Sequence, residues 1–356
     1  VPLWLVRQMT RLHQGRLVGD TIAAVVRRPD EAAELLALYW KDGRCPLSAQ
    51  LKRGLRLAFA TWDEYRLAKW NRDGAVKLRD ALFLSHAKPK DAEQDALWKR
   101  LIGGALATPD TWETALSGGA DKREAWTRLL TERKLGYLAL LMNLRNMVEA
   151  RVDPTVVRTA LLDGAKGSQA LPFRFVSAAK HAPAFADAIS DAMLVALGNA
   201  APLVGATAIV VDTSVSMNDP LSAKGETTRM EAAGALAILL REIADARVFA
   251  FSGECAEVPK YRGLSLIDYI LHRVPRNGTY LAKALATVQR ACPEVGRVVV
   301  VTDEQSHDGI APAWTSRAYL INVAPYQPGL DTHHGWTRIN GWSERVVDWM
   351  RVEETP

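Results

Sequence analysis

The stretch from Ala206 to Asn218 limits the fold of this chain more than any other. Its first six residues, Ala206 to Val211, carry no charge, and they predict a β-strand that is buried on both faces. The run stops at Asp212, and Ser214 and Ser216 follow at alternate positions. Because a strand buried on both faces needs helices on either side, the sequence predicts an α/β sheet here.

One carboxylate and two hydroxyl oxygens at a strand end suit a hard divalent cation such as Mg²⁺. The same residue types also mark ordinary turns, so the pattern needs support from elsewhere in the chain. A second predicted strand, 297–301, is followed by Asp303, and Thr279 precedes a predicted helix at 280–291. Functional groups of an open α/β sheet gather beyond the carboxyl ends of its strands. We therefore expect one constellation of oxygen ligands, formed by Asp212, Ser214, Ser216, Thr279 and Asp303.

This pattern resembles the metal-ion-dependent adhesion site (MIDAS) of von Willebrand factor A domains. All five positions hold the expected residue types. The resemblance implies a Rossmann-like domain whose Ser and Thr side chains coordinate Mg²⁺, or Mn²⁺, while the Asp side chains coordinate directly or through water.

A rival interpretation makes Asp212 the nucleophile of a haloacid-dehalogenase-type phosphotransferase. That chemistry needs a second acid two residues later as the general acid. Position 214 is Ser, which cannot serve as that acid, so the sequence favours a protein that is not an enzyme.

With 356 residues, of which 48% are hydrophobic and 24% charged, the chain is long enough for two globular domains. No segment has the apolar length of a membrane span, and Arg7 and Arg11 interrupt the amino terminus, so no signal peptide is expected. The three cysteines lie far apart and indicate neither disulfides nor a zinc site. We expect a cytoplasmic monomer that does not bind membranes.

The charge is divided unevenly along the chain. Residues 1–200 contain 30 Lys and Arg against 22 Asp and Glu, whereas residues 201–356 contain 15 against 18. A basic excess confined to the first part is compatible with a polyanionic partner, although scattered Lys and Arg are usually solvated helix faces.

Residues 1–197 read as consecutive helices without an alternating strand pattern. No tight repeat of fixed period is present, which leaves a degenerate HEAT-like α-solenoid. Residues 203–356 read as an alternating α/β domain with a strand at 318–323 near the sheet edge. The segment 325–341, with His333 and His334, is expected to be a surface loop without metal.

The most informative helical segment is Leu51 to Lys90. It concentrates basic residues and interleaved aromatics against only four acidic residues, a combination that suits phosphates and unpaired bases. The ordinary interpretation is that Trp62, Trp70 and Phe83 are core residues and that His86 ends a helix with a backbone hydrogen bond. Both interpretations remain open at this point.

The same segment resembles the TROVE module of the Ro autoantigen family, known in animals and bacteria. The resemblance rests on Leu-Lys-Arg-Gly-Leu-Arg, Lys-Trp-Asn-Arg and Leu-Ser-His-Ala-Lys-Pro, on the helix from Tyr137, and on Leu171-Pro-Phe-Arg-Phe. A TROVE module followed by a von Willebrand A domain is also that family's domain order.

The resemblance implies a ring of HEAT-like repeats closed by the second domain. It further implies binding of small noncoding Y-like RNA and of single-stranded ends of misfolded RNA, with a protein partner such as an exoribonuclease. By motif, the family's RNA-contacting residues map onto Lys69, Arg72 and His86. Charge clustering adds Lys52, Arg53, Arg56, Lys77, Arg79 and Lys88.

The chain departs from the animal pattern in three respects. Its helical module is shorter, the element from Lys69 to Arg72 is one residue shorter, and Asn277 stands where a glycine is expected. Asn tolerates a left-handed backbone, so the metal loop is expected to survive. The alternative hypothesis is a protein-interaction scaffold whose metal site binds an acidic residue of a partner, with RNA incidental.

Overall fold

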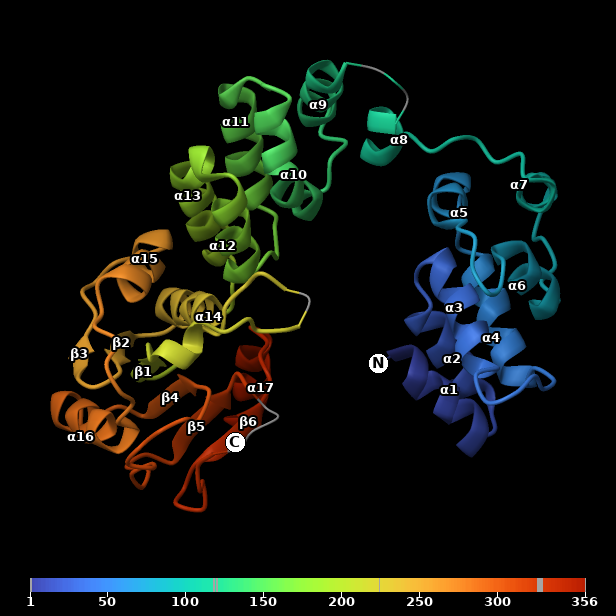
Figure 1. Ribbon diagram of the computed structural model, residues 1–356. Helices are drawn as coiled ribbons and strands as arrows, with labels where there is room; N and C mark the ends of the chain where they lie inside the picture. The colour runs from blue at the N-terminus through green and yellow to red at the C-terminus, as the bar shows by residue number, and fades with distance from the viewer. Residues whose placement is uncertain (1, 118, 120, 224, 325–328, 356) are drawn as a thin grey trace. The chain divides into compact units, whose positions relative to one another are not determined.

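The computed structural model describes residues 2–117, 119, 121–223, 225–324 and 329–355. The chain divides into two compact units, residues 1–120 and residues 121–356 (Figure 1). In its described residues the first unit is helical, whereas the second combines helices with a sheet. The predicted division near residue 200 separates the helical part of the chain from the part that contains strands. The two compact units, however, divide between residues 120 and 121.

The first unit is built from short helices whose starts are fixed by side-chain caps. Ser48, Asp63 and Asp91 each accept a hydrogen bond from the backbone N–H three residues later. The described helices are α1 (Pro2–Leu12), α2 (Arg16–Val25), α3 (Pro29–Tyr39), α4 (Ala49–Phe59), α5 (Glu64–Trp70), α6 (Leu78–Ser85), α7 (Ala92–Gly103) and α8 (Trp112–Ser117).

These helices pack in layers, as a HEAT-like stack requires. Helix α2 packs on α4, α4 on α6, α1 on α3 and α5 on α7. Helices α2 and α4 lie close together, since a Cβ at Gly54 would lie 2.5 Å from the side chain of Ile22. One continuous core results, to which Leu36, Leu51 and Phe59 contribute fully buried side chains.

The second unit begins with further helices, which run directly onto the sheet domain. They are α9 (Lys122–Thr131), α10 (Tyr137–Glu149), α11 (Pro154–Ala165), α12 (Pro172–His181), the 3₁₀ turn η1 (Pro183–Phe185) and α13 (Ala186–Leu197). Helices α12 and α13 both contact α14 (Arg229–Ile243), the first helix of the sheet domain. This packing explains why the helices after residue 121 and the sheet form one compact unit.

The sheet of the described residues has the order β3-β2-β1-β4-β5-β6, with β3 antiparallel and the other strands parallel. Its strands are β1 (Thr207–Asp212), β2 (Ala246–Phe251), β3 (Cys255–Glu257), β4 (Arg297–Thr302), β5 (Arg317–Asn322) and β6 (Thr337–Asn340). Every residue of β1 and β4 is buried, which confirms the predicted central strands.

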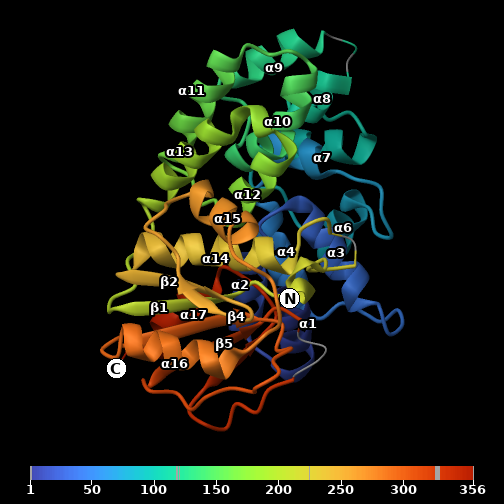
Figure 2. The same cartoon turned by 60° about the vertical axis from the view of Figure 1, so that its left-hand side comes forward.

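Helices cover both faces of this sheet. Figure 2 shows α14 on one side of the strands and α16 (Leu281–Ala291) on the other. Helix α15 (Leu264–His272) packs beside α14, and α17 (Val346–Glu353) is tied to the sheet by ion pairs of Glu354 with Arg297 and Arg317. The carboxyl ends of β1 and β4 therefore emerge between two helical layers.

The structure corrects two expectations about the sheet domain and adds one strand to it. The strand predicted at 318–323 is not at the edge, because β6 pairs with β5 outside it. Part of the segment 325–341 is therefore strand rather than surface loop, while residues 325–328 lie outside the described part. The short strand β3 was also missed, because three half-exposed or exposed residues have no hydrophobic pattern.

A buried carboxyl group, that of Glu344, joins the segment before α17 to the start of α12. Glu344 is 7% exposed and accepts a hydrogen bond from the backbone N–H of Phe173 at 2.8 Å. Burial raises the pKa of Glu344 to about 7, against the lowering effect of that hydrogen bond and of Arg174 and Arg345.

The raised pKa of Glu344 predicts a pH-dependent stability. As the pH rises from about 4.5 to about 7, the unfolded chain releases this proton before the folded chain does, so the free energy of unfolding falls. At about 1.4 kcal/mol per pKa unit, the loss is on the order of 3 kcal/mol. Urea unfolding at several pH values should show this loss in the wild type and its absence in Glu344→Gln. An equal pH dependence in both proteins would contradict the assignment.

Candidate functional site

Four of the five predicted metal-site residues lie at the carboxyl ends of β1 and β4, and Thr279 lies on the loop before α16. Asp212 ends β1, and its Oδ1 accepts a hydrogen bond from the backbone N–H of Ser214 at 2.8 Å. The hydroxyl oxygens of Ser214 and Ser216 are 3.1 Å apart. The alternate spacing in the sequence therefore turns both hydroxyl groups toward the same point.

The loop after β4 closes on the same point. Thr302 Oγ1 donates to Asp212 Oδ2 at 2.6 Å, and the next residue, Asp303, is 1% exposed. Thr279 is joined to this loop by its backbone, since its carbonyl oxygen accepts from the N–H of His307 at 2.9 Å. The sheet thus assembles residues separated by up to 91 positions in the sequence.

A buried cation that the sequence analysis missed lies among these residues. Arg229, the first residue of α14, donates to Asp303 Oδ2 at 3.0 Å and to the carbonyl oxygen of Ser216 at 3.2 Å. Its residue exposure is 4%, and it also pairs with Asp219 at 3.4 Å. The only sequence signal near it is the capping box of Thr228 and Glu231, which marks a helix start rather than a site.

The donor set fits a divalent cation in its chemistry. Burial raises the pKa of Asp212 to about 6, and the neighbouring charge of Asp303 contributes in the same direction. Two buried carboxylates and two adjacent hydroxyl oxygens, with no nitrogen or sulfur ligand among the five predicted residues, are ligands that Mg²⁺ and Mn²⁺ prefer. Arg229 supplies part of the positive charge that such a site requires.

The loop that carries Thr279 is held against the end of β2. Ser252 Oγ donates to the carbonyl oxygen of Pro275 at 2.6 Å, and the N–H of Tyr280 donates to the carbonyl oxygen of Ser252 at 3.0 Å. A Cβ at Gly253 would lie 2.0 Å from the carbonyl oxygen of Asn277. The left-handed residue of this loop is Gly278, with φ of 78°, so Asn277 does not need the left-handed backbone.

Gly253→Ala is expected to move the Thr279 loop, because a methyl group cannot fit against a backbone oxygen 2.0 Å away. We expect a stability loss of about 1–3 kcal/mol and weaker binding of Mn²⁺. Thermal unfolding and equilibrium dialysis with Mn²⁺ measure the two effects. Gly296→Ala is the control, since its nearest neighbouring atom would be 3.9 Å away. Unchanged Mn²⁺ binding in Gly253→Ala would contradict the role given to this loop.

In the first unit, Lys69 and Arg72 surround the indole of Trp70. The Arg72 guanidinium carbon is 5.1 Å from the ring centroid and the Lys69 ammonium nitrogen is 5.7 Å from it. Arg28, from the start of α3, is nearer, at 4.4 Å. Lys69 and Arg72 form no ion pair with a carboxylate in the described part of the chain, so their charges are available to phosphates.

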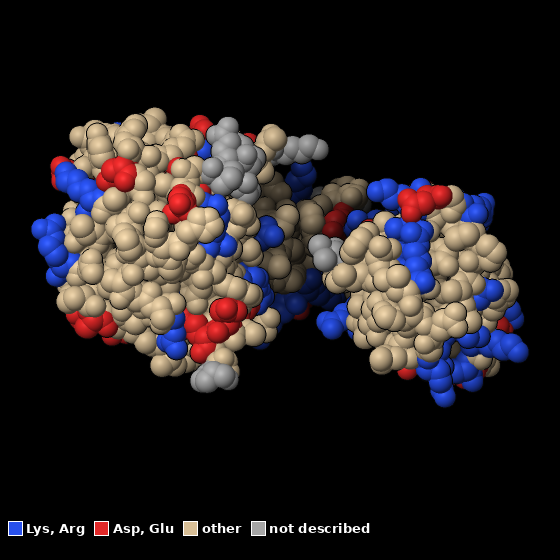
Figure 3. Space-filling view, turned by 90° about the horizontal axis from the view of Figure 1, so that it is seen from below, with Lys and Arg blue, Asp and Glu red and all other residues tan. Residues whose placement is uncertain are grey.

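The other predicted RNA-contacting residues are more dispersed. Lys52 and Arg56 lie on α4 away from its buried face, whereas Arg53 turns to α2 and pairs with Asp20 at 2.8 Å. The remaining predicted residues have local surroundings: Lys77 pairs with Asp73 at 3.4 Å, Arg79 pairs with Asp80 at 3.7 Å, and His86 and Lys88 are exposed. In Figure 3, Lys and Arg are spread over the face shown of the first unit, with fewer acidic groups among them.

The structure also tests the expectation that three aromatic residues of the first unit belong to the core. Trp62 is 3% exposed and is confirmed as a core residue. Phe83 is 58% exposed and Trp70 is only partly buried, so the core assignment was wrong for both. His86 ends α6 in a left-handed conformation and donates its backbone N–H to Phe83, as expected of a helix-end residue.

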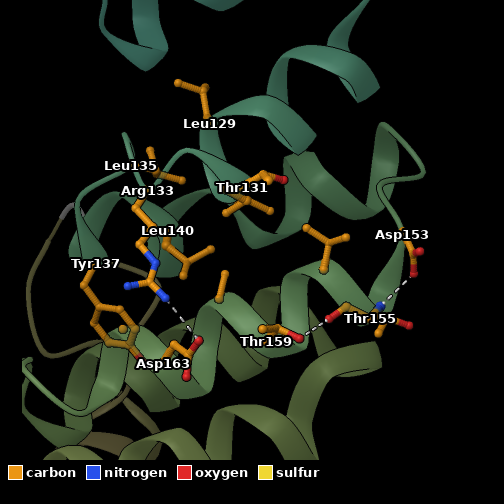
Figure 4. A pocket seen from close by; sticks show the side chains of 14 residues that line it. Leu129, Thr131, Arg133, Leu135, Tyr137, Leu140, Asp153, Thr155, Thr159 and Asp163 are labelled. Atoms are coloured by element: carbon orange, nitrogen blue, oxygen red, sulfur yellow. Dashed lines mark hydrogen bonds and ion pairs between the residues drawn. The ribbon is translucent and has the colours of Figure 1, made fainter.

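Other features of the described residues do not coincide with these sites. A cavity of about 520 Å³ lies among α9, α10 and α11, with the Arg133–Asp163 ion pair and Tyr137 along one side (Figure 4). His333 pairs with Asp331 at 3.7 Å, and the described residues contain no cluster of three His, Cys, Asp or Glu that could hold a metal. None of the described helices has the length and apolarity to span a membrane.

Comparison with known proteins identifies the architecture. Residues 99–233 match the family model of the TROVE domain. The crystal structure of the Ro (RSR) protein of Deinococcus radiodurans is similar with a TM-score of 0.70 and 19% sequence identity, and the match covers 99% of this chain and 87% of that one. No curated protein matches the chain.

These findings confirm the resemblance to the Ro family and the predicted fold class, a helical TROVE module followed by a von Willebrand A-like domain. The matched segment begins at residue 99, so it does not include the basic residues between 52 and 88. It includes Ser214 and Ser216 but not Thr279 or Asp303. The roles of both sets of residues remain predictions.

Proposed function

We propose that this chain, which carries a TROVE domain and the fold of a bacterial Ro protein, is an RNA-binding protein without enzymatic activity. Its ligands are small noncoding, Y-like RNA and the single-stranded ends of structured or misfolded RNA. It acts as a cytoplasmic, monomeric scaffold in RNA quality control, with an exoribonuclease as one partner. The resemblance also implies that the helical repeats and the second domain close into a ring. That arrangement stays a prediction.

The observation that carries this proposal is the group formed by Lys69, Arg72 and Trp70. Two cations without a carboxylate partner in the described residues lie over a partly buried indole. Phosphates bind such cations, and aromatic rings stack on bases, so the group offers both kinds of contact that single-stranded RNA uses.

A filter-binding salt titration with small structured RNA tests the proposal. We expect retention near physiological salt and a linear fall of log affinity with log salt, with a slope of about −0.7 for each phosphate that a single strand contacts. Absence of RNA retention near physiological salt would reject RNA binding. Polyphosphate of the same charge serves as a control, because it measures binding that depends on phosphates alone and not on bases.

The second part of the proposal is that Asp212, Ser214, Ser216, Thr279 and Asp303 hold a divalent cation, Mg²⁺ or Mn²⁺. A cation in this site would supply an open coordination position for an anionic ligand, either a carboxylate or a phosphate. The loop of Thr279 would fix the position of that protein ligand, whereas the positive charge of Arg229, which pairs with Asp303, would compete with the cation.

A second candidate function is a protein scaffold that binds an acidic partner residue at the metal site. Val215, 64% exposed, and Tyr280, 41% exposed, directly follow metal-site residues in the chain. Apolar groups beside an anion site favour a peptide over a bare phosphate. Metal-dependent retention of an acidic peptide, together with no RNA binding, would favour this alternative.

A further inference from the structure

The position of Trp70 differs from that of the other tryptophans near it. Trp62 and Trp98 are 3% and 5% exposed and pack edge-on against Phe59, with ring centroids 4.8 and 6.4 Å apart. Trp70, at the end of α5, is not among the residues that pack against this core, and Leu67 is the only residue of α5 that is buried. The indole of Trp70 is therefore held by something other than core packing.

Charged side chains take the place of that packing. Arg28, Arg72 and Lys69 lie 4.4, 5.1 and 5.7 Å from the ring centroid. Lys69 is also 5.6 Å from the ring of Tyr65, which is 48% exposed and one helical turn earlier on α5. Arg28 differs from the other two cations, because it pairs with Asp30 at 3.1 Å and lies near Glu31 at 3.6 Å.

The contacts of Lys69 and Arg72 with the indole are weak enough to be replaced by contacts with a ligand. An exposed cation–π contact contributes only about 0.5–1 kcal/mol, whereas a hydrogen bond between ionised groups is stronger. A phosphate that approaches Lys69 and Arg72 would therefore draw these cations from the ring. The part of the indole that these cations cover would then be free to stack on a base, which contributes about 1–3 kcal/mol.

Resting on the RNA-binding function proposed above, we propose that Trp70 is a stacking platform for one unpaired nucleobase, while Lys69 and Arg72 bind the phosphates that flank it. The base must be unpaired, because both faces of a base within a duplex are covered by its neighbours. Arg28, which pairs with Asp30 and Glu31, keeps its contact with the indole. This site therefore selects single-stranded or bulged RNA over duplex.

The test compares three probes on the full chain: a short single-stranded RNA, an abasic strand of equal length, and the RNA paired with its complement. For Trp70→Leu we expect about tenfold weaker binding of the single strand and unchanged binding of the abasic strand. Trp70→Tyr should keep most of the affinity, because it keeps an aromatic face. Phe83→Leu, which removes an exposed aromatic side chain of the same unit, should have no effect.

Equal losses for the single strand and the abasic strand, or no loss for either, would overturn the proposal. That result would leave the RNA-binding function intact. Failure of the RNA-binding function would be seen separately, as an absence of RNA binding by the wild-type chain. A second measurement needs no variant: a strand carrying 5-iodouridine should photo-crosslink to Trp70 in the wild-type chain. A crosslink only at other residues would also overturn the proposal.

Discussion

Replacing Lys69 and Arg72 together by Glu is expected to lower RNA affinity at least about a hundredfold near physiological salt. The double substitution removes two cations that have no carboxylate partner in the described residues and places two anions beside the RNA backbone. If each cation contacts one phosphate of a single strand, the slope of log affinity against log salt becomes shallower by about 1.4. Filter binding over a range of salt concentrations measures the affinity and the slope together.

Lys122→Glu with Arg123→Glu is the matched control. Both residues are exposed at the start of α9, and the change in net charge is the same. A general electrostatic effect would lower affinity equally in both double variants. That outcome would contradict a specific role for Lys69 and Arg72.

Arg229→Met is expected to have two large and opposite effects. Without metal, the buried Asp303 carboxylate loses its cation, and the free energy of unfolding should fall by about 3–5 kcal/mol. With metal, the variant should bind Mn²⁺ about tenfold more tightly, because two cations a few Å apart repel by some kcal/mol at an effective dielectric constant of about 20. Equilibrium dialysis with Mn²⁺ and thermal unfolding at increasing Mn²⁺ concentrations measure both effects.

Arg229→Lys distinguishes the effect of the positive charge from the effect of the shape of the guanidinium group. It keeps the positive charge at the start of α14, so its Mn²⁺ affinity should stay near that of the wild type. If Arg229→Met binds Mn²⁺ more weakly than the wild type, Arg229 supports the metal ligands rather than competing with the cation. Asp212→Asn should abolish the effect of Mn²⁺ on thermal unfolding in either background.

Some of this molecule follows from local sequence. The uncharged run before Asp212 predicts a strand buried on both faces, and the structure buries every residue of β1. The end of that run places a carboxylate at the carboxyl edge of the sheet, where the loops after parallel strands meet. The start of α14 follows its capping box, because such signals act over three or four residues.

Short edge elements could not be predicted in this way. Strands β3 and β6 have three and four residues, and none of these is fully buried. Their backbone hydrogen bonds depend on the neighbouring strand rather than on their own hydrophobic pattern. Only the assembled sheet shows that β5 lies inside it.

The sequence by itself determined which residue types stand at the ends of the central strands and that the basic excess belongs to the helical part. The tertiary structure alone decided that Arg229 meets Asp303, 74 residues away, and that Trp70 is held by cations while Trp62 is buried. The spacing of apolar residues gives the period of a helix, but which face is covered depends on neighbours distant in the sequence. Long-range pairs such as Arg229 with Asp303 and Arg28 with Trp70 therefore formed only when the helices and strands packed together.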